Sequence, residues 1–102
     1  MVFDARPLAA FLVGDPRAST VVAALEEPGV ISALSALELA RLLAHVPPRE
    51  IALTLRRLGV EVAPLCGDAA LALAAFDPGL REQQATLALA RERGARVFEW
   101  TP

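Results

Sequence analysis

The chain contains no lysine, tyrosine or asparagine, and only one cysteine among its 102 residues. The single cysteine, Cys66, cannot form an internal disulfide, which indicates a reducing compartment. No stretch approaches the roughly 20 apolar residues that span a bilayer. The apolar run Leu8–Val13 is closed by Gly14 and Asp15 and is too short for a secretion signal. We therefore expect a cytoplasmic protein without a membrane partner.

The chain also lacks an excess of positive charge. Ten arginines are set against twelve acidic residues, giving a formal net charge of -2, which argues against bulk electrostatic binding of nucleic acid. Hydrophobic residues make up 55% of the chain, above the usual ~45–50%. This composition excludes a disordered chain and indicates a face buried against a partner. The length predicts one domain, residues 1–102.

Several common chemical sites are missing. The sequence has no phosphate-binding loop, no dinucleotide-binding glycine turn and no zinc-ligand spacing. The only candidates for a thiol–imidazole pair, Cys66 and His45, fall in different connections with no residue to orient them. We interpret Cys66 as a small buried hydrophobe and His45 as a residue at a helix end.

Strand and helix patterns alternate along the chain. Two helices separate each short apolar strand from the next, so every crossover can return the chain parallel. This predicts an α/β fold of three layers, in which a central four-stranded parallel sheet is flanked by helices on both faces. One helical segment, Ala69–Phe76, carries no charge and must be buried in the core or in a dimer interface. The predicted strands are Val2–Phe3, Val30–Ile31, Val60–Ala63 and Arg96–Glu99.

Two acidic residues follow the first two predicted strands. Asp4 ends the first strand, and Glu38 lies in the first turn of a helix that we expect to begin at Ser35. Ligands bind at the carboxyl ends of the strands in such sheets, and converging carboxylates there would hold Mg²⁺ or Mn²⁺. A structural alternative remains open, because Asp4 can cap a helix and Ser35-Ala36-Leu37-Glu38 has the pattern of a capping box.

A series of segments along nearly the whole chain resembles the PIN domain, the fold of VapC-type toxin ribonucleases. Val2–Pro16 resembles the opening of that domain, and Ile31–Arg41 resembles its second motif, with Glu38 at the acidic position. Three later segments resemble its third strand and the helix and strand that finish the site: Leu58–Pro64, Thr86–Arg91 and Gly94–Val97.

The resemblance implies a parallel sheet with three or four acidic residues around one or two divalent metal ions, where activated water cleaves RNA. Asp4 matches the first acidic position and Glu38 the second. The third falls on Gln83 and the fourth on Thr101, neither of which is acidic. The neighbouring acids Glu82 and Glu99 could substitute, although a shift of one residue points a side chain elsewhere.

Other departures from the family pattern concern the surroundings of the site. Arg6 stands where the family usually has Ser or Thr, the segment before the third position is compressed into Asp77–Glu82, and the chain ends at Pro102, before elements that often complete the domain. Fewer carboxylates attract a metal less strongly. We hypothesise that Arg6 pairs with Asp4 or Glu38 and occupies the metal's space, the alternative being an Arg6 that points into solvent.

Three functional interpretations follow. The first is a PIN-like homologue with an incomplete metal site, catalytically impaired, that acts as a binding or assembly module and forms a homodimer through surfaces such as Ala69–Phe76. The second is an active Mg²⁺-dependent endoribonuclease of toxin type, silenced by an antitoxin-type protein. The third is a small α/β domain whose carboxylates only cap helices. Binding of RNA would require four arginines to line one rim: Arg81, Arg91, Arg93 and Arg96.

Overall fold

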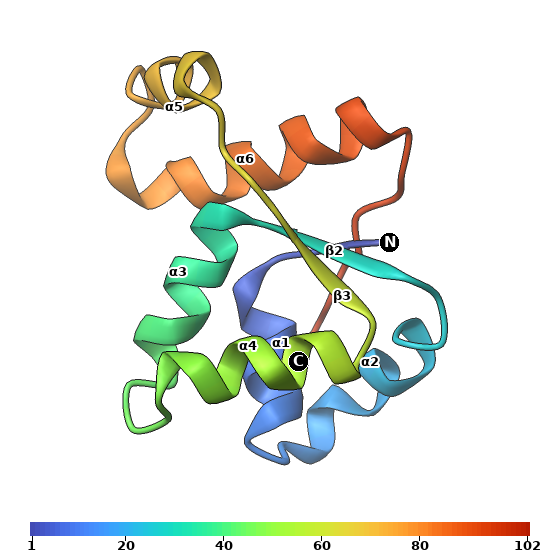
Figure 1. Cartoon of the computed structure of the whole chain (residues 1–102). Coiled ribbons are helices and arrows are strands. Elements are labelled where there is room, and N and C mark those ends of the chain that lie inside the picture. The colour runs from blue at the N-terminus through green and yellow to red at the C-terminus, as the bar shows by residue number, and fades with distance from the viewer.

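The computed structural model describes all 102 residues and confirms an α/β fold built on a parallel sheet (Figure 1). The sheet has three strands in the order β1 (Val2–Phe3), β2 (Gly29–Ser32) and β3 (Val60–Ala63). All the pairs are parallel, and Ile31 at the centre of β2 is in register with Phe3 on one side and Val62 on the other. None of the helices combines the length and the apolar character needed to cross a membrane.

Two helical segments lie in each crossover, as the sequence predicts. The 3₁₀ turn Pro16–Ala18 is capped by Asp15, whose side chain accepts a hydrogen bond from Arg17 N. Gly94, the C-terminal cap of α6, has a left-handed φ of 60°, a conformation that favours glycine. The α-helices are α1 (Ala5–Leu12), α2 (Ser19–Ala24), α3 (Ala33–Leu42), α4 (Pro48–Arg57), α5 (Gly67–Leu73) and α6 (Pro78–Arg93).

The side chains of the strands alternate between two hydrophobic cores, one on each face of the sheet. Phe3 and Ile31 enter the larger core with Leu8, Leu39 and other residues of α1 to α4. Their strand neighbours, among them Val2 and Val30, enter a smaller core with residues of α6. This alternation is the period of two expected of strands covered on both faces. Figure 1 shows the resulting layers, with α6 on one side of the sheet and α1, α2 and α4 on the other.

The predicted fourth strand, Arg96–Glu99, does not form. The segment makes a single parallel bridge, between Val97 and Val2. Val2 N donates to Arg96 O at 2.7 Å, and Phe98 N donates to Val2 O at 2.8 Å. Because β1 is only two residues long and it is Val2 whose N–H and C=O bond to the tail, the last segment pairs with one residue. The sheet therefore has three strands and one residue of a fourth.

The uncharged segment Ala69–Phe76 is not buried in the core. The helix α5 begins and ends earlier, at Gly67 and Leu73, and packs mainly against α6 on the side away from the sheet (Figure 1). Leu73 is buried, whereas Leu71 is 74% exposed. The face of the sheet on this side is already covered by Leu89 and Ala90 of α6, which leaves no apolar layer for α5 to enter.

The helix after β2 begins two residues earlier than the sequence predicts. Ser32, the last residue of β2, is the N-cap of α3, and its side chain accepts a hydrogen bond from Ser35 N at 3.0 Å. The predicted capping box from Ser35 to Glu38 is therefore wrong. Because Ser32 takes the capping role, Ser35 lies inside the helix and is completely buried.

Candidate functional site

Asp4 lies where β1 ends and α1 begins, at the carboxyl edge of the sheet. It is the N-cap of α1, with extended backbone angles, and its Oδ1 accepts a hydrogen bond from Arg6 N at 3.2 Å. The cap satisfies one of the free N–H groups in the first turn of the helix. The structural role that the sequence leaves open for Asp4 is therefore present.

Glu82 reaches the same place from α6. Its Oε1 accepts a hydrogen bond from Ala5 N, the first residue of α1, at 2.9 Å. The same oxygen accepts a hydrogen bond from Ser35 Oγ of α3 at 3.0 Å. One carboxylate thus links three helices, and two acidic side chains, Asp4 and Glu82, bond to the first turn of α1. Anionic groups are favoured at this end of a helix by the unpaired N–H groups and the helix dipole.

A polar cavity of about 310 Å³ lies at this edge, and no hydrophobic residue lines it. Its lining joins the start of α1 to the first turns of α6: Asp4, Arg6, Gly79, Glu82 and Gln83. The cavity therefore contains two carboxylates, one guanidinium and one amide. Each carboxylate has one oxygen bonded to the backbone of α1, while Oδ2 of Asp4 and Oε2 of Glu82 accept no hydrogen bond from the protein.

The partial burial of Asp4 changes its acidity. Desolvation raises the pKa of its carboxyl above the usual range of an aspartate. The hydrogen bond from Arg6 N and the charge of the Arg6 side chain oppose this rise in pKa without cancelling it. The ionised carboxylate of Asp4 is therefore less well hydrated in the folded protein than in the unfolded chain.

Glu38, the second acid implied by the resemblance, does not line the cavity. Its carboxylate forms an ion pair with Arg41 one turn along α3, with Arg41 Nε donating to Glu38 Oε2 at 2.8 Å. This pair lowers the pKa of Glu38, chiefly through the hydrogen bond. The expected meeting of Asp4 and Glu38 is replaced by the meeting of Asp4 and Glu82.

Arg6 lines the cavity but does not pair with either expected carboxylate. Its guanidinium takes part in none of the four ion pairs of the molecule, and its side chain is exposed. Only its backbone N–H bonds to Asp4. The hypothesis of an ion pair with Asp4 or Glu38 is therefore corrected to a solvent-exposed cation at the rim, because the first turn of α1 directs the side chain outward.

The other predicted positions separate into two groups. Gln83, at the third acidic position, lines the cavity beside Glu82, so neighbouring positions of α6 both reach it. Thr101 and Glu99 do not line it. They belong to the tail after Val97, which leaves the sheet after a single bridge and fixes Trp100 by a hydrogen bond from Nε1 to Arg17 O at 3.0 Å. The structure thus brings Asp4, Glu82 and Gln83 together.

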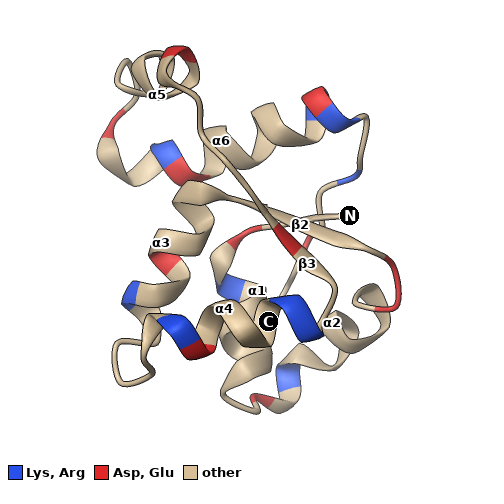
Figure 2. Cartoon of the chain, in the orientation of Figure 1, with Lys and Arg blue, Asp and Glu red and all other residues tan.

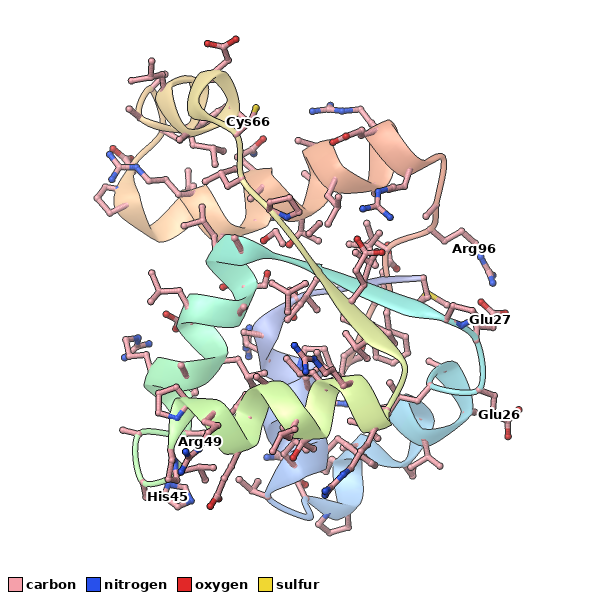
Figure 3. All side chains as sticks on the ribbon, in the orientation of Figure 1. Glu26, Glu27, His45, Arg49, Cys66 and Arg96 are labelled. Carbon is pink, nitrogen blue, oxygen red and sulfur yellow. The ribbon has the colours of Figure 1, made fainter.

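Three of the four arginines considered for an RNA-binding rim are engaged by other groups of the protein. Arg93 is paired with Glu61 at 2.7 Å, and Arg96 extends toward Glu27 at 3.5 Å (Figure 3). Arg81 Nε donates to the carbonyl of Phe76. Figure 2 shows charges of both signs scattered over the elements instead of gathered on one face.

His45 and Cys66 lie at opposite ends of the molecule (Figure 3), which excludes a thiol–imidazole pair. His45 follows α3, as predicted, beside an apolar cavity of about 330 Å³. Cys66 is an exposed free thiol at the N-cap of α5, so its interpretation as a buried hydrophobe is wrong. Its exposure follows from the position of α5 outside the core.

The donor set of the polar cavity fits a divalent cation only weakly. No group of three or more His, Cys, Asp or Glu side chains is placed to hold a metal ion. Mg²⁺ can bind through one or two carboxylates together with waters and substrate oxygens, and the free oxygens of Asp4 and Glu82 meet this minimum. These two residues would hold the ion, which would supply charge to polarise a phosphate group.

Sequence reasoning missed the part played by Ser35 and Thr86. Both hydroxyls are buried, and Ser35 Oγ lies 3.0 Å from Glu82 Oε1 and 3.4 Å from Thr86 Oγ1. The helical periodicity places both residues on a face that turns toward the core, and a polar residue on such a face indicates a buried hydrogen bond. The partners are 47 and 51 residues apart in the chain, so no local pattern connects them.

Comparison with models of protein families and with curated proteins finds no match to this chain.

Proposed function

We propose that this chain is a PIN-like homologue with an incomplete acidic site, catalytically impaired, that acts as a binding or assembly module. The observation that carries the proposal is that the acidic residues expected at one site are separated in the structure. Glu38 is engaged by Arg41 outside the cavity, and the two carboxylates within the cavity each use one oxygen to cap α1. Two free carboxylate oxygens supply less negative charge than three or four acids would.

Exposed apolar side chains on α5, on α6 and in the turn between them support the assembly role. Four large hydrophobic side chains in this part of the chain are exposed: Leu71, Phe76, Leu80 and Leu87. Figure 2 shows no arginine on α5. We propose that these side chains contribute to a surface on which a second copy of the chain docks, as in a homodimer.

The test of impaired catalysis is cleavage of single-stranded RNA in the presence of Mg²⁺, with Asp4→Asn as the matched variant. Asparagine keeps the shape and the capping oxygen of Asp4 and removes only the charge. We expect no cleavage above background from either folded protein. Cleavage by the unmodified chain that disappears in Asp4→Asn would refute the proposal.

The second candidate is an active Mg²⁺-dependent endoribonuclease of toxin type. The observation in its favour is that Asp4 and Glu82 line the same cavity and each retain one oxygen without a protein donor. In that case the chain would act on RNA and be held inactive by an antitoxin-type protein. The exposed free thiol of Cys66 suits the reducing cytoplasm in which either protein would work.

A further inference from the structure

Another cavity, of about 280 Å³, lies between the carboxyl ends of β2 and β3 and the helices α5 and α6. It shares no lining residue with the cavity that Asp4 lines. Ligands of open parallel sheets bind outside the carboxyl ends of the strands. Figure 3 shows Cys66, one of the lining residues, where the chain passes from β3 to α5. The cavity therefore lies in a place that suits a ligand and is independent of the site described above.

Small side chains keep this cavity open. Five of its lining residues are alanines, each with only a methyl group to fill the space. Ala63, Ala85 and Leu89 are buried and form its base, whereas Ala88 and Cys66 are exposed at its mouth. A cavity of about 150 Å³ can hold benzene, so this one has room for an aliphatic chain of several carbons.

One charged group faces the apolar walls. Glu92 of α6 is the only charged residue of the lining, and its carboxylate takes part in none of the four ion pairs of the molecule. The other polar side chains offer little to a ligand. The hydroxyl of Ser32 is buried and donates its proton to Ser35 Oγ, and the thiol of Cys66 is a weak hydrogen-bonding group. The cavity thus presents a single negative charge beside an apolar surface.

We propose that this cavity binds a small organic ammonium compound, in which an aliphatic chain of about four to six carbons carries one positive charge. The chain packs between Ala69 of α5 and Ala88 of α6, and the ammonium group pairs with Glu92 while remaining in contact with water. Such a division between a buried stem and a solvated head is the one that lysine side chains adopt on protein surfaces. A second copy of this chain cannot supply such a lysine, because the chain contains none.

The test uses the only thiol of the chain, Cys66, as the reporter of occupancy, because it lines the cavity and is free. The probe is hexylammonium, and the measured quantity is the rate at which neutral iodoacetamide alkylates the thiol at pH 7. We expect hexylammonium to slow this reaction until the site is saturated. The uncharged 1-hexanol should bind about two- to fivefold more weakly, the range of an exposed ion pair, and hexanoate should give no protection.

Three variants separate the charge of the site from its shape. Glu92→Gln should abolish the preference for hexylammonium over 1-hexanol. Glu26→Gln removes an exposed acid that lies far from Cys66 (Figure 3) and should leave the preference unchanged. Ala88→Leu fills the mouth of the cavity and should remove the protection by both compounds. All three substituted residues are exposed, so the core and the fold are retained.

A second readout does not depend on the thiol. Heteronuclear NMR should show that hexylammonium shifts the amide resonances of Ala69 and Ala88, which line the cavity, and leaves that of Ala5, beside the Asp4 cavity, in place. Equal protection by hexanoate, a charge preference that persists in Glu92→Gln, or shifts at Ala5 without shifts at Ala69 and Ala88 would overturn the proposal. RNA cleavage is unaffected by any of these outcomes, so a failure here is distinguishable from a failure of the proposed function.

Discussion

At the scale of single residues, Asp4 combines a favourable and an unfavourable interaction. Its Oδ1 caps α1, while partial burial raises the pKa of its carboxyl. The folded state therefore binds the Asp4 proton more tightly than the unfolded state does. This stabilising contribution is complete below the usual pKa of an aspartate and is lost as the pH rises through the higher folded pKa.

Asp4→Asn is expected to increase the stability of the protein at pH 7, because the amide keeps the capping oxygen and removes the partly desolvated charge. The gain should be no more than about 1 kcal/mol, since part of the carboxyl remains in water. It should disappear as the pH falls below the unfolded pKa of aspartate, where both side chains are neutral. Urea unfolding of both proteins across this pH range measures the difference, and a loss of stability at pH 7 would contradict the account.

Residue roles could be predicted from the sequence where they are local. The caps at Asp4 and Asp15 bond to N–H groups two residues away, so a short pattern contains both partners. The positioning of Glu82 depends on Ser35, 47 residues away, and on how α3 and α6 pack. The failed prediction for Glu38 has the same cause. The resemblance predicts where Glu38 lies in the chain, but not that its carboxylate pairs with Arg41 instead of approaching Asp4.

At the scale of elements, the short strands could be predicted because their residues are β-branched or apolar and are bounded by Gly, Pro or Asp. The sequence could not show that β1 is too short to pair fully with a fourth strand. It also could not place the uncharged segment Ala69–Phe76, since such a segment fits a core and an exposed interface equally well. The position of α5 outside the core follows from the packing of α6 on the sheet.

Neighbouring leucines of α5 should respond differently to substitution. Leu73 is 8% exposed and Leu71 is 74% exposed. Leu73→Ala should reduce the free energy of unfolding by about 2–3 kcal/mol, whereas Leu71→Ala should change it by less than about 0.5 kcal/mol. Chemical denaturation tests both values. If α5 were instead packed within the core, Leu71→Ala would be the more damaging change.

The start of β2 has no room for a side chain. A Cβ at Gly29 would lie 2.8 Å from Cε2 of Phe3 and 3.3 Å from Cγ2 of Val60. Gly29→Ala should therefore destabilise the protein by about 1–3 kcal/mol through overpacking. Gly67→Ala is the control, because no atom lies within 4 Å of its Cβ position and its φ is not left-handed. Equal thermal shifts for the two variants would contradict the close approach.

At the scale of the whole molecule, the two ends of the chain are joined at the edge of the sheet. Val97 bridges Val2, the ring of Phe98 lies 5.3 Å from that of Phe3, and Trp100 bonds to Arg17. The tail therefore covers the edge of β1 that a full fourth strand would otherwise cover. This arrangement joins segments from opposite ends of the chain, and the sequence indicates it only as a weak strand pattern.

The tail should contribute to global stability. Phe98→Ala is expected to lower the free energy of unfolding by about 1–3 kcal/mol, less than for a fully buried phenylalanine. Glu99→Ala, a change at an exposed neighbour, should lie within about 0.5 kcal/mol of the unmodified chain. Trp100 is the only tryptophan and the chain has no tyrosine, so its fluorescence reports the unfolding of this region. Indistinguishable curves for the two variants would show that the tail contributes nothing.

The same topology creates the edge of the sheet where the start of α1 meets α3 and α6. The central claim is that this edge gathers Asp4 and Glu82 and leaves Glu38 with Arg41. The most direct measurement is anomalous X-ray diffraction from a crystal grown in excess Mn²⁺. We predict that Asp4 and Glu82 line one cavity, that Glu38 stays paired with Arg41, and that no Mn²⁺ peak joins Asp4 to Glu38. A peak shared by Asp4 and Glu38, or a Glu38 side chain turned into the cavity beside Asp4, would contradict the account.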